Sequence, residues 1–273
     1  MKRRRRVFAA IVAGVAAVSC ATPAARVAEF SARQQFQSLL LPGGGYTLVA
    51  YFKPGLGSGK VLHVYLEHDG VAWIAPDQVA ADPTPRQTLM LAAMAQDSSP
   101  SLYLGRPCYF GRSTDMGCGP RLWTHERYSQ TVVNAMTTAL QNFLPRHSTT
   151  RLIFLGYSGG GALAMLLAEQ FPETQVVVTV AGNLDIVAWA KRHDYSPLEG
   201  SLNPADRQPL PSRVKQFHYV GGLDTNVPPV LTESIPSLPQ GSVITIPKFD
   251  HVCCWQAWWP SLLRSLESQL VTN

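Results

Sequence analysis

Ser158 is the residue best placed to act as a nucleophile. It lies in Gly156-Tyr157-Ser158-Gly159-Gly160, between the apolar residues 152–155 and the small residues 159–162. A tight turn between a buried strand and a helix would lift the serine above a sheet, at the positive end of the helix. Side chains two residues before and two residues after the serine would clash in such a turn, and both positions are glycine. We predict a nucleophilic serine; the alternative is an ordinary tight turn.

A serine hydroxyl needs a base that accepts its proton. Three histidines follow Ser158 in the chain. His193 lies in an irregular polar stretch, and His218 lies inside an apolar run that is typical of a core strand. His251 lies five residues after the last expected strand and just before the last expected helix. We therefore predict that His251 is the general base and then the general acid.

The histidine needs a carboxylate that fixes its tautomer and stabilises its charged form. Asp224 follows an apolar run and a small-residue turn, and a proline comes four residues later. Asp185 follows the preceding expected strand and is the alternative. Asp250 is adjacent to His251 and would point elsewhere if the turn is regular. The sequence favours Asp224.

An acyl-transfer site also needs two backbone N–H groups aimed at the developing negative charge. Gly159, directly after the nucleophile, is expected to supply one. The other is expected from the loop at residues 66–73, with Asp69 as the first choice and Gly70 as the second. His68 precedes the serine and is interpreted as a residue that shapes the loop or faces the substrate.

Alternating strands and helices must position these residues. Short apolar runs predict buried parallel strands, and two earlier runs predict an antiparallel pair. The expected antiparallel pair is residues 46–52 and 60–67, and the expected parallel strands are 101–105, 151–156, 175–181, 216–221 and 242–246. The expected helices are 86–96, 128–144, 159–170, 229–235 and 255–270. This alternation predicts a mostly parallel sheet with helices on both faces and chemistry at the carboxyl ends of the strands.

With these motifs in place, residues 36–272 resemble an α/β-hydrolase, and more specifically a poorly characterised group of bacterial exported hydrolases. The shared marks are Tyr65-Leu66-Glu67-His68-Asp69-Gly70, Asp82-Pro83-Thr84-Pro85-Arg86, Gly105-Arg106-Pro107-Cys108, Cys118, Trp123-Thr124, Gly156-Tyr157-Ser158-Gly159-Gly160-Gly161, Ala181-Gly182-Asn183-Leu184-Asp185 and His251-Val252-Cys253-Cys254-Trp255. Members of the group often have Gly-Asp-Gly where this chain has His68-Asp69-Gly70. The resemblance implies serine-hydrolase chemistry and leaves the substrate open, because this fold hosts many hydrolytic specificities.

The expected cover of the site is small. Residues 186–214, where cap domains of this fold usually insert, contain four prolines and cannot form a long helix. Tyr157, Trp73 and Trp189 are candidates to line a substrate pocket, and ordinary packing is the alternative for each. Three tryptophans at residues 255–259 share one face of the last helix and favour core packing.

The amino terminus has the pattern of an export signal. Five of the 23 basic residues lie at positions 2–6, and an apolar stretch of thirteen residues follows, which is too short to span a bilayer. Without those five, 18 basic residues face 18 acidic residues, so the rest of the chain lacks the charge of a nucleic-acid binder.

Cys20 ends a segment, Ala17-Val18-Ser19-Cys20, that resembles a bacterial lipobox. We expect a lipoprotein-type signal peptide at residues 1–19, lipidation of Cys20, a tether at 20–35 and one hydrolase domain at 36–273. The alternative is ordinary signal-peptidase cleavage after Ala21 or Ala25. The expected location is the cell envelope, on the periplasmic face of the outer membrane if the host has two membranes.

Four further cysteines remain. In an oxidising compartment, Cys108 and Cys118 could close a short glycine-rich loop. The adjacent Cys253 and Cys254 would form a strained bond, and free buried thiols are the alternative. No CxxC or HxxxH spacing exists, which argues against zinc, and no cofactor motif is visible.

The sequence therefore predicts an exported serine hydrolase that cleaves a carboxylic ester through an acyl-enzyme. The expected partners are a small-molecule ester and a membrane reached by the lipid anchor. A peptidase or amidase with the same triad is the first alternative. A non-catalytic lipoprotein that binds a ligand or an envelope partner is the second, and a thiol-disulfide protein lacks the CxxC geometry.

Overall fold

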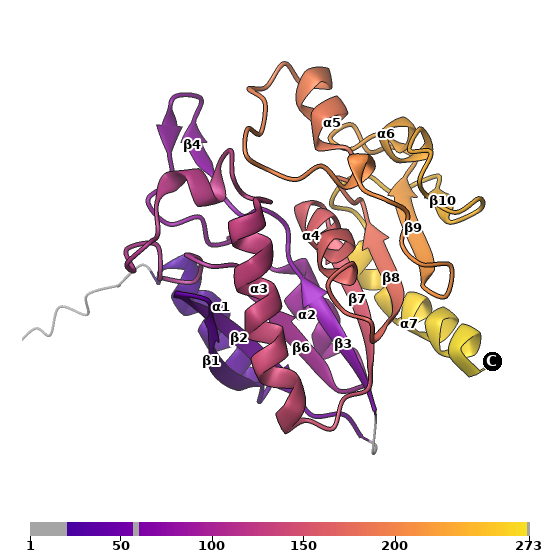
Figure 1. Ribbon diagram of the computed structural model, residues 1–273, viewed down its shortest axis with the longest axis horizontal. Helices are drawn as coiled ribbons and strands as arrows, with labels where there is room; N and C mark the ends of the chain where they lie inside the picture. Colours follow the sequence, from indigo (N-terminus) through magenta and orange to yellow (C-terminus); the bar gives the residue numbers. More distant parts are fainter. Residues whose placement is uncertain (1–20, 57–59, 272–273) are drawn as a thin grey trace, which may run out of the picture.

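The centre of the molecule is an eight-stranded sheet in a computed structural model that describes residues 21–56 and 60–271 (Figure 1). Across the sheet the strands are β1 (Gln37–Gly43), β2 (Tyr46–Lys53), β6 (Ser101–Leu104), β3 (Val61–Leu66), β7 (Arg151–Tyr157), β8 (Thr174–Val180), β9 (Lys215–Gly221) and β10 (Val243–Ile246). The strands from β6 to β10 pair in parallel, whereas β1 pairs with β2 and β2 with β6 in antiparallel. The expected mostly parallel sheet is confirmed.

The central strand β7 shows why these segments are apolar. All of its residues after Arg151 are buried, because helices cover both faces of a parallel sheet. One expectation about pairing is wrong: β2 and β3 are not an antiparallel pair. Strand β6 lies between them, pairing antiparallel with β2 and in parallel with β3, so β2 and β3 do not form a hairpin.

Helices form a layer on each side of the sheet. Their bounds are α1 (Pro23–Arg33), α2 (Leu89–Ala95), α3 (Gln130–Phe143), α4 (Gly159–Ala168), α5 (Ile186–Arg192), α6 (Pro229–Glu233) and α7 (Trp255–Val271). Figure 1 shows α3 and α4 side by side in front of the sheet, and α2 packs with α7 on the opposite face. Trp255 and Trp259 of α7 are fully buried, as expected for core packing.

The segment expected to be a tether is largely helical. Thr22 caps α1 by accepting a hydrogen bond from the N–H of Ala25, and Val27 and Ser31 are buried against the rest of the molecule. An amphipathic segment that can bury one face gains more by packing than by staying extended. The signal-peptide and Cys20 predictions lie outside the described residues. Within the described ranges, no helix has both the length and the apolar character to cross a bilayer.

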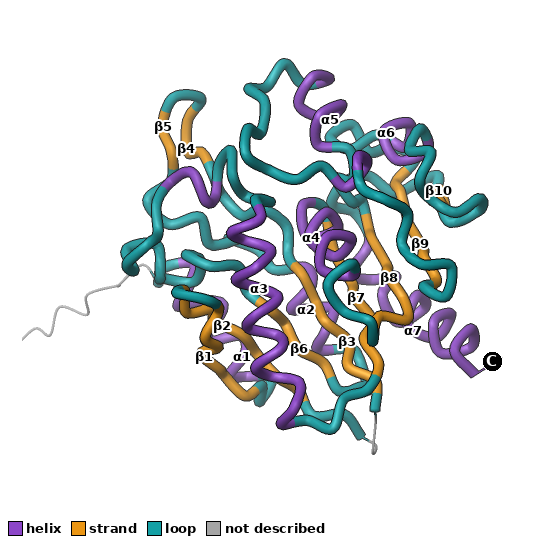
Figure 2. The backbone as a smooth tube through the Cα atoms, in the orientation of Figure 1, coloured by secondary structure: helices purple, strands orange, loops and turns teal. Residues whose placement is uncertain are grey.

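Long connections gather where the parallel strands end. Figure 2 shows loops, together with α5 and α6, at the carboxyl end of the sheet. A hairpin of β4 (Trp73–Ala75) and β5 (Gln78–Val79) projects from the same end. The connection from β8 to β9 contains only α5 and a 3₁₀ turn, Pro204–Asp206, so the cover over the site is small, as expected.

Candidate active site

Ser158 lies at the sharp turn between β7 and α4. Its φ of +53° is a left-handed conformation that is costly for a side-chain-bearing residue. Three backbone hydrogen bonds hold it: the Ser158 N–H donates to Val180 O (3.0 Å), and the Ser158 C=O accepts from the N–H groups of Gly161 (2.9 Å) and Asn183 (3.0 Å). A Cβ on Gly156 would overlap the backbone of Gly160. Local strain in the turn thus presents the serine hydroxyl above the sheet.

The structure brings Ser158, His251 and Asp224 together. His251 Nε2 lies 3.1 Å from Ser158 Oγ, and His251 Nδ1 lies 2.8 Å from Asp224 Oδ2. The side chain of Asp224 is buried, whereas that of His251 keeps 18% exposure. This arrangement lets a proton move from the serine hydroxyl to the imidazole while the carboxylate fixes the ring.

The loop after β9 holds Asp224 in place. Its other oxygen, Oδ1, accepts from the backbone N–H groups of Asn226 and Val227, both at 2.8 Å. His193 Nε2 lies 2.7 Å from the carbonyl of Asn226, on the same loop. The carboxylate therefore has one oxygen for the loop and one for the imidazole.

The competing candidates have structural roles. Asp185 caps α5 by accepting from the N–H of Ala188 (3.0 Å), and Asp250 accepts from the N–H groups of the two residues after His251. His218 is fully buried in β9 beside Thr179, and burial lowers its pKa to about 4. Within the described ranges, no three His, Cys, Asp or Glu side chains form a group suited to a metal ion.

The expected oxyanion donors differ in whether their backbone N–H groups already donate a hydrogen bond. In the described part of the chain, the N–H groups of Gly159 and Asp69 have no hydrogen-bond acceptor. Gly70 does not fit, because its N–H already donates to His68 Nδ1 (3.0 Å). Since His68 Nε2 lies 3.0 Å from the carbonyl of Gln87, this histidine shapes the loop.

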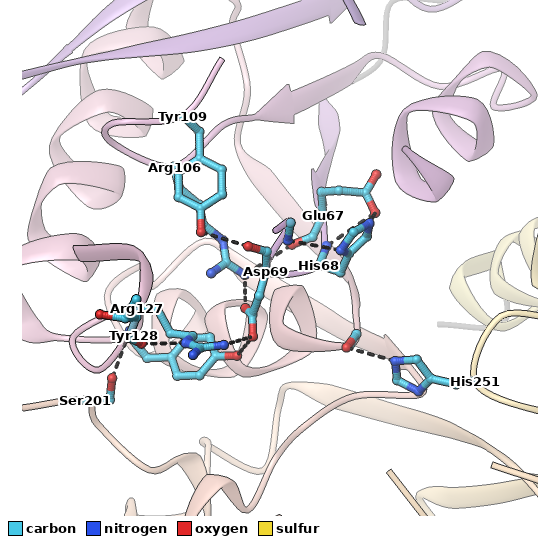
Figure 3. Close-up of polar contacts among 12 residues, drawn as sticks. Glu67, His68, Asp69, Arg106, Tyr109, Arg127, Tyr128, Ser201 and His251 are labelled. Atoms are coloured by element: carbon cyan, nitrogen blue, oxygen red, sulfur yellow. Dashed lines mark hydrogen bonds and ion pairs between the residues drawn. The ribbon is translucent and has the colours of Figure 1, made fainter. Parts of the chain in front are cut away.

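A cluster around Asp69 was missed from the sequence. Figure 3 shows the Asp69 carboxylate close to Arg127 and Tyr128, with Tyr109 directed at the backbone of Asp69. Arg106 Nη2 lies 2.8 Å from one carboxylate oxygen, while Arg127 Nη1 (3.0 Å) and the Tyr128 hydroxyl (2.6 Å) donate to the other. Tyr109 donates to Asp69 O at 2.9 Å. The cluster anchors the loop in which the second oxyanion donor was expected.

The charges in this cluster outweigh the effect of burial. Burial alone would raise the pKa of Asp69, but the guanidinium groups of Arg106 and Arg127 hold it well below its ordinary value. A Cβ on Gly159 would overlap both Asp69 Oδ1 and the Tyr128 hydroxyl, so the cluster lies directly against the residue after the nucleophile. One signal was present in the sequence: Arg106 directly follows the predicted strand 101–105, so it lies at the same end of the sheet as the loop that carries Asp69.

Ser158 opens into a cavity of about 630 Å³. Of the expected pocket residues, Tyr157 and Trp189 line it, and the Tyr157 hydroxyl also donates to the backbone carbonyl of His251 (2.9 Å). Trp73 does not line this cavity. It stands on β4 with 39% exposure and contacts the ring of His125, because the β4–β5 hairpin carries it away from the nucleophile.

The four described cysteines form two pairs. The sulfurs of Cys108 and Cys118 lie within bonding distance, with Cα atoms 5.6 Å apart. The sulfurs of Cys253 and Cys254 are also within bonding distance, and both residues are exposed. The burial expected for these residues as free thiols is wrong, because both lie exposed just before α7.

Comparisons with solved structures show an α/β-hydrolase fold. An esterase from Pyrococcus furiosus matches with a TM-score of 0.59 and 10% identity, over 85% of this chain and 90% of that one. A puromycin-hydrolyzing peptidase from Mycobacterium tuberculosis matches with a TM-score of 0.58 and 16% identity, over 86% of this chain and 38% of that one. An α/β serine hydrolase without a lid from Xanthomonas campestris matches with a TM-score of 0.50 and 13% identity, over 85% and 94%.

No family model matches the chain, and no curated protein matches it. At these identities the structural likeness shows the fold alone.

Proposed function

We propose that this protein is a serine hydrolase that cleaves carboxylic esters through an acyl-enzyme. The observation that carries the proposal is the chain of two hydrogen-bond distances from Ser158 Oγ through His251 to Asp224, at the strained turn that opens into the cavity. The mostly parallel sheet and its likeness to esterases and peptidases support hydrolysis.

The reaction runs in two halves. In the first, Ser158 Oγ attacks the ester carbonyl while His251 Nε2 takes the hydroxyl proton, and the oxyanion forms against the N–H groups of Gly159 and Asp69. The C–O bond to the alcohol then breaks, and His251 returns the proton to the leaving oxygen. In the second, His251 deprotonates a water that attacks the acyl-enzyme, and the acid leaves as Ser158 recovers its proton.

A fluorophosphonate probe tests this proposal, because it reacts covalently with activated serines. We expect the purified protein to label, Ser158→Ala and His251→Ala not to label, and Ser212→Ala, at an exposed serine that does not line the cavity, to label like wild type. A folded wild-type protein that does not label would reject the catalytic proposal and favour a binding protein. If the wild type is labelled, its rates on matched p-nitrophenyl esters and p-nitroanilides would rank ester against amide cleavage.

The export proposal rests on the sequence alone. We propose that residues 1–19 are removed and that Cys20 carries a lipid that holds the protein in the cell envelope. Metabolic labelling with a palmitate analogue in a bacterial host should mark the wild type and not Cys20→Ser. Equal labelling of both would reject the anchor, and release of an unlipidated wild type would favour ordinary cleavage.

A further inference from the structure

Asn183 is a buried amide in the wall of the reaction cavity. It follows β8, keeps only 3% exposure, and lines the same cavity as Ser158. Its backbone N–H donates to Ser158 O (3.0 Å), so the residue lies directly beside the nucleophile. The backbone therefore supports the turn whatever the side chain does.

The side chain of Asn183 makes no hydrogen bond with any described residue. Its Oδ1 is buried without a partner, and its amide nitrogen donates to none of these residues either. Among the lining residues of this cavity, Asp69 also has a buried oxygen without a hydrogen bond, but that oxygen is ion-paired with Arg106. Buried polar groups in proteins are almost always paired, so an unpaired amide beside a nucleophile calls for a partner from outside the chain.

A second buried asparagine on the same connection shows what a structural role looks like. Asn203 Oδ1 accepts from the N–H of Ile186 (3.0 Å), and its nitrogen donates to Asp185 (3.1 Å) and Asp206 (3.2 Å). Every polar atom of that side chain is used to hold α5 and the turn before β9. Asn183 has no comparable task.

We propose, as an extension of the proposed hydrolase function, that the Asn183 side chain binds an amide group of the substrate near the reacting ester. A primary amide is neutral and carries both a donor and an acceptor, which matches a peptide-like –CO–NH– group. A plain alkyl chain in the same place would leave the asparagine unpaired. The substrates implied are esters whose acyl or alcohol part carries an amide, such as N-acylated amino acid esters.

Two matched substrate pairs test the proposal. On the acyl side, the p-nitrophenyl ester of N-acetylglycine is compared with p-nitrophenyl pentanoate, which has the same chain length without the amide. On the alcohol side, 2-acetamidoethyl acetate is compared with pentyl acetate. For each pair, the kcat/KM of the amide-bearing ester is divided by the kcat/KM of the alkyl ester. For one of the pairs, this ratio should be about tenfold lower in Asn183→Leu than in wild type, mainly because the amide-bearing ester turns over more slowly. Comparing variants cancels differences in the intrinsic reactivity of the esters.

Stability gives an independent readout. Because Asn183→Leu removes an unpaired polar group, its Tm should be equal to that of wild type or up to about 2 °C higher. Asn203→Ala, in contrast, should lower Tm and leave both kcat/KM ratios unchanged. If leucine does not fit beside Ser158, Asn183→Ala must lower the same ratio.

Unchanged ratios for both pairs in Asn183→Leu and Asn183→Ala would overturn the proposal for Asn183, and a lower Tm in both would assign it a structural role. If wild type cleaves none of the four esters and does not label with the fluorophosphonate, the proposed hydrolase function itself fails.

Discussion

Asp69 and Asp224 are two aspartates that follow strands of the same sheet, yet their surroundings differ. Asp69, after β3, is surrounded by two guanidinium groups and a tyrosine hydroxyl. Asp224, after β9, faces two backbone N–H groups and the imidazole of His251. The first carboxylate is neutralised by fixed cations, whereas the second faces a group whose charge can change. The comparison teaches that a carboxylate with permanent cations holds structure, and one with a titratable partner is free for chemistry.

The Asp69 region also bears on the site electrostatically. Two guanidinium groups and one carboxylate leave a net positive charge against Gly159. A fixed positive charge near a developing oxyanion stabilises it without any rearrangement during the reaction. The two aspartates thus support the same proposed reaction, one through geometry and charge at the oxyanion and the other through the base.

The largest expected effect is a loss of catalytic activity on substitution of Asp224. Asp224→Asn should lower kcat by about 10⁴-fold, because the amide favours the wrong imidazole tautomer and cannot stabilise its charged form. Tm should change little, since an asparagine oxygen can still accept from the backbone N–H groups of Asn226 and Val227. Steady-state kinetics and thermal unfolding measure both. Asp185→Asn serves as the control, because Asp185 caps α5 away from the triad, and its kcat should stay near wild type. A larger loss of kcat in Asp185→Asn than in Asp224→Asn would reverse the assignment.

The next effect is on stability. Asp69→Asn leaves the buried Arg106 and Arg127 without a counter-charge and should lower the free energy of unfolding by about 3 kcal/mol. Asp77→Asn, on the exposed β4–β5 turn, should stay within about 0.5 kcal/mol of wild type. Urea unfolding gives both numbers.

The difference in unfolding free energy between wild type and Asp69→Asn should depend on pH, because the pKa of Asp69 is lowered. A depressed carboxyl pKa stabilises the fold at every pH above the ordinary value of 3.8, and this stabilisation is lost as pH falls toward the lowered pKa. The gap between wild type and Asp69→Asn should therefore stay constant from pH 7 to pH 4 and shrink below it. A gap that closes between pH 7 and pH 5 would argue against the ion pairs.

These contrasts also explain which parts were readable from the sequence. The Ser158 turn could be read because strain demands glycines at fixed positions, and the histidine and its acid follow strands in a regular order. The Asp69 cluster was missed because Arg127 and Tyr128 reach it from a distant segment, and no local pattern encodes such a meeting. Helix α1 was missed because the short polar stretch gains stability only by packing on the sheet.

A third prediction concerns the segment that carries Arg106 and Tyr109 to Asp69. The Cys108–Cys118 pair closes a loop of ten residues' separation on that segment, so the double variant Cys108→Ser/Cys118→Ser should lose about 2–3 kcal/mol of unfolding free energy. Dithiothreitol should lower the stability of wild type by a similar amount. Adding dithiothreitol to the double variant measures how much Cys253 and Cys254 contribute to the free energy of unfolding. If the double variant is as stable as wild type, the pair does not support the Asp69 cluster.

The smallest expected effect concerns Glu67, two residues before Asp69, whose carboxylate forms no ion pair with any arginine that the structure describes. Burial raises its pKa, although His68 and the N–H of Met90 act in the opposite direction. A raised carboxyl pKa means that the ionised form destabilises the fold, and this penalty grows as pH rises from the ordinary value of 4.5 through the folded pKa. Glu67→Gln keeps an oxygen for Met90 and removes the charge.

The glutamine variant should therefore be more stable than wild type by about 1 kcal/mol at pH 8, a rise in Tm of about 2–4 °C, and the gain should vanish at pH 4. Glu199→Gln, at an exposed position, should show no pH-dependent gain. A Glu67→Gln protein that is less stable than wild type at both pH values would show that hydrogen bonds to the carboxylate outweigh its burial. The contrast with Asp69 would then be wrong, because both carboxylates of this loop would stabilise the fold as ions.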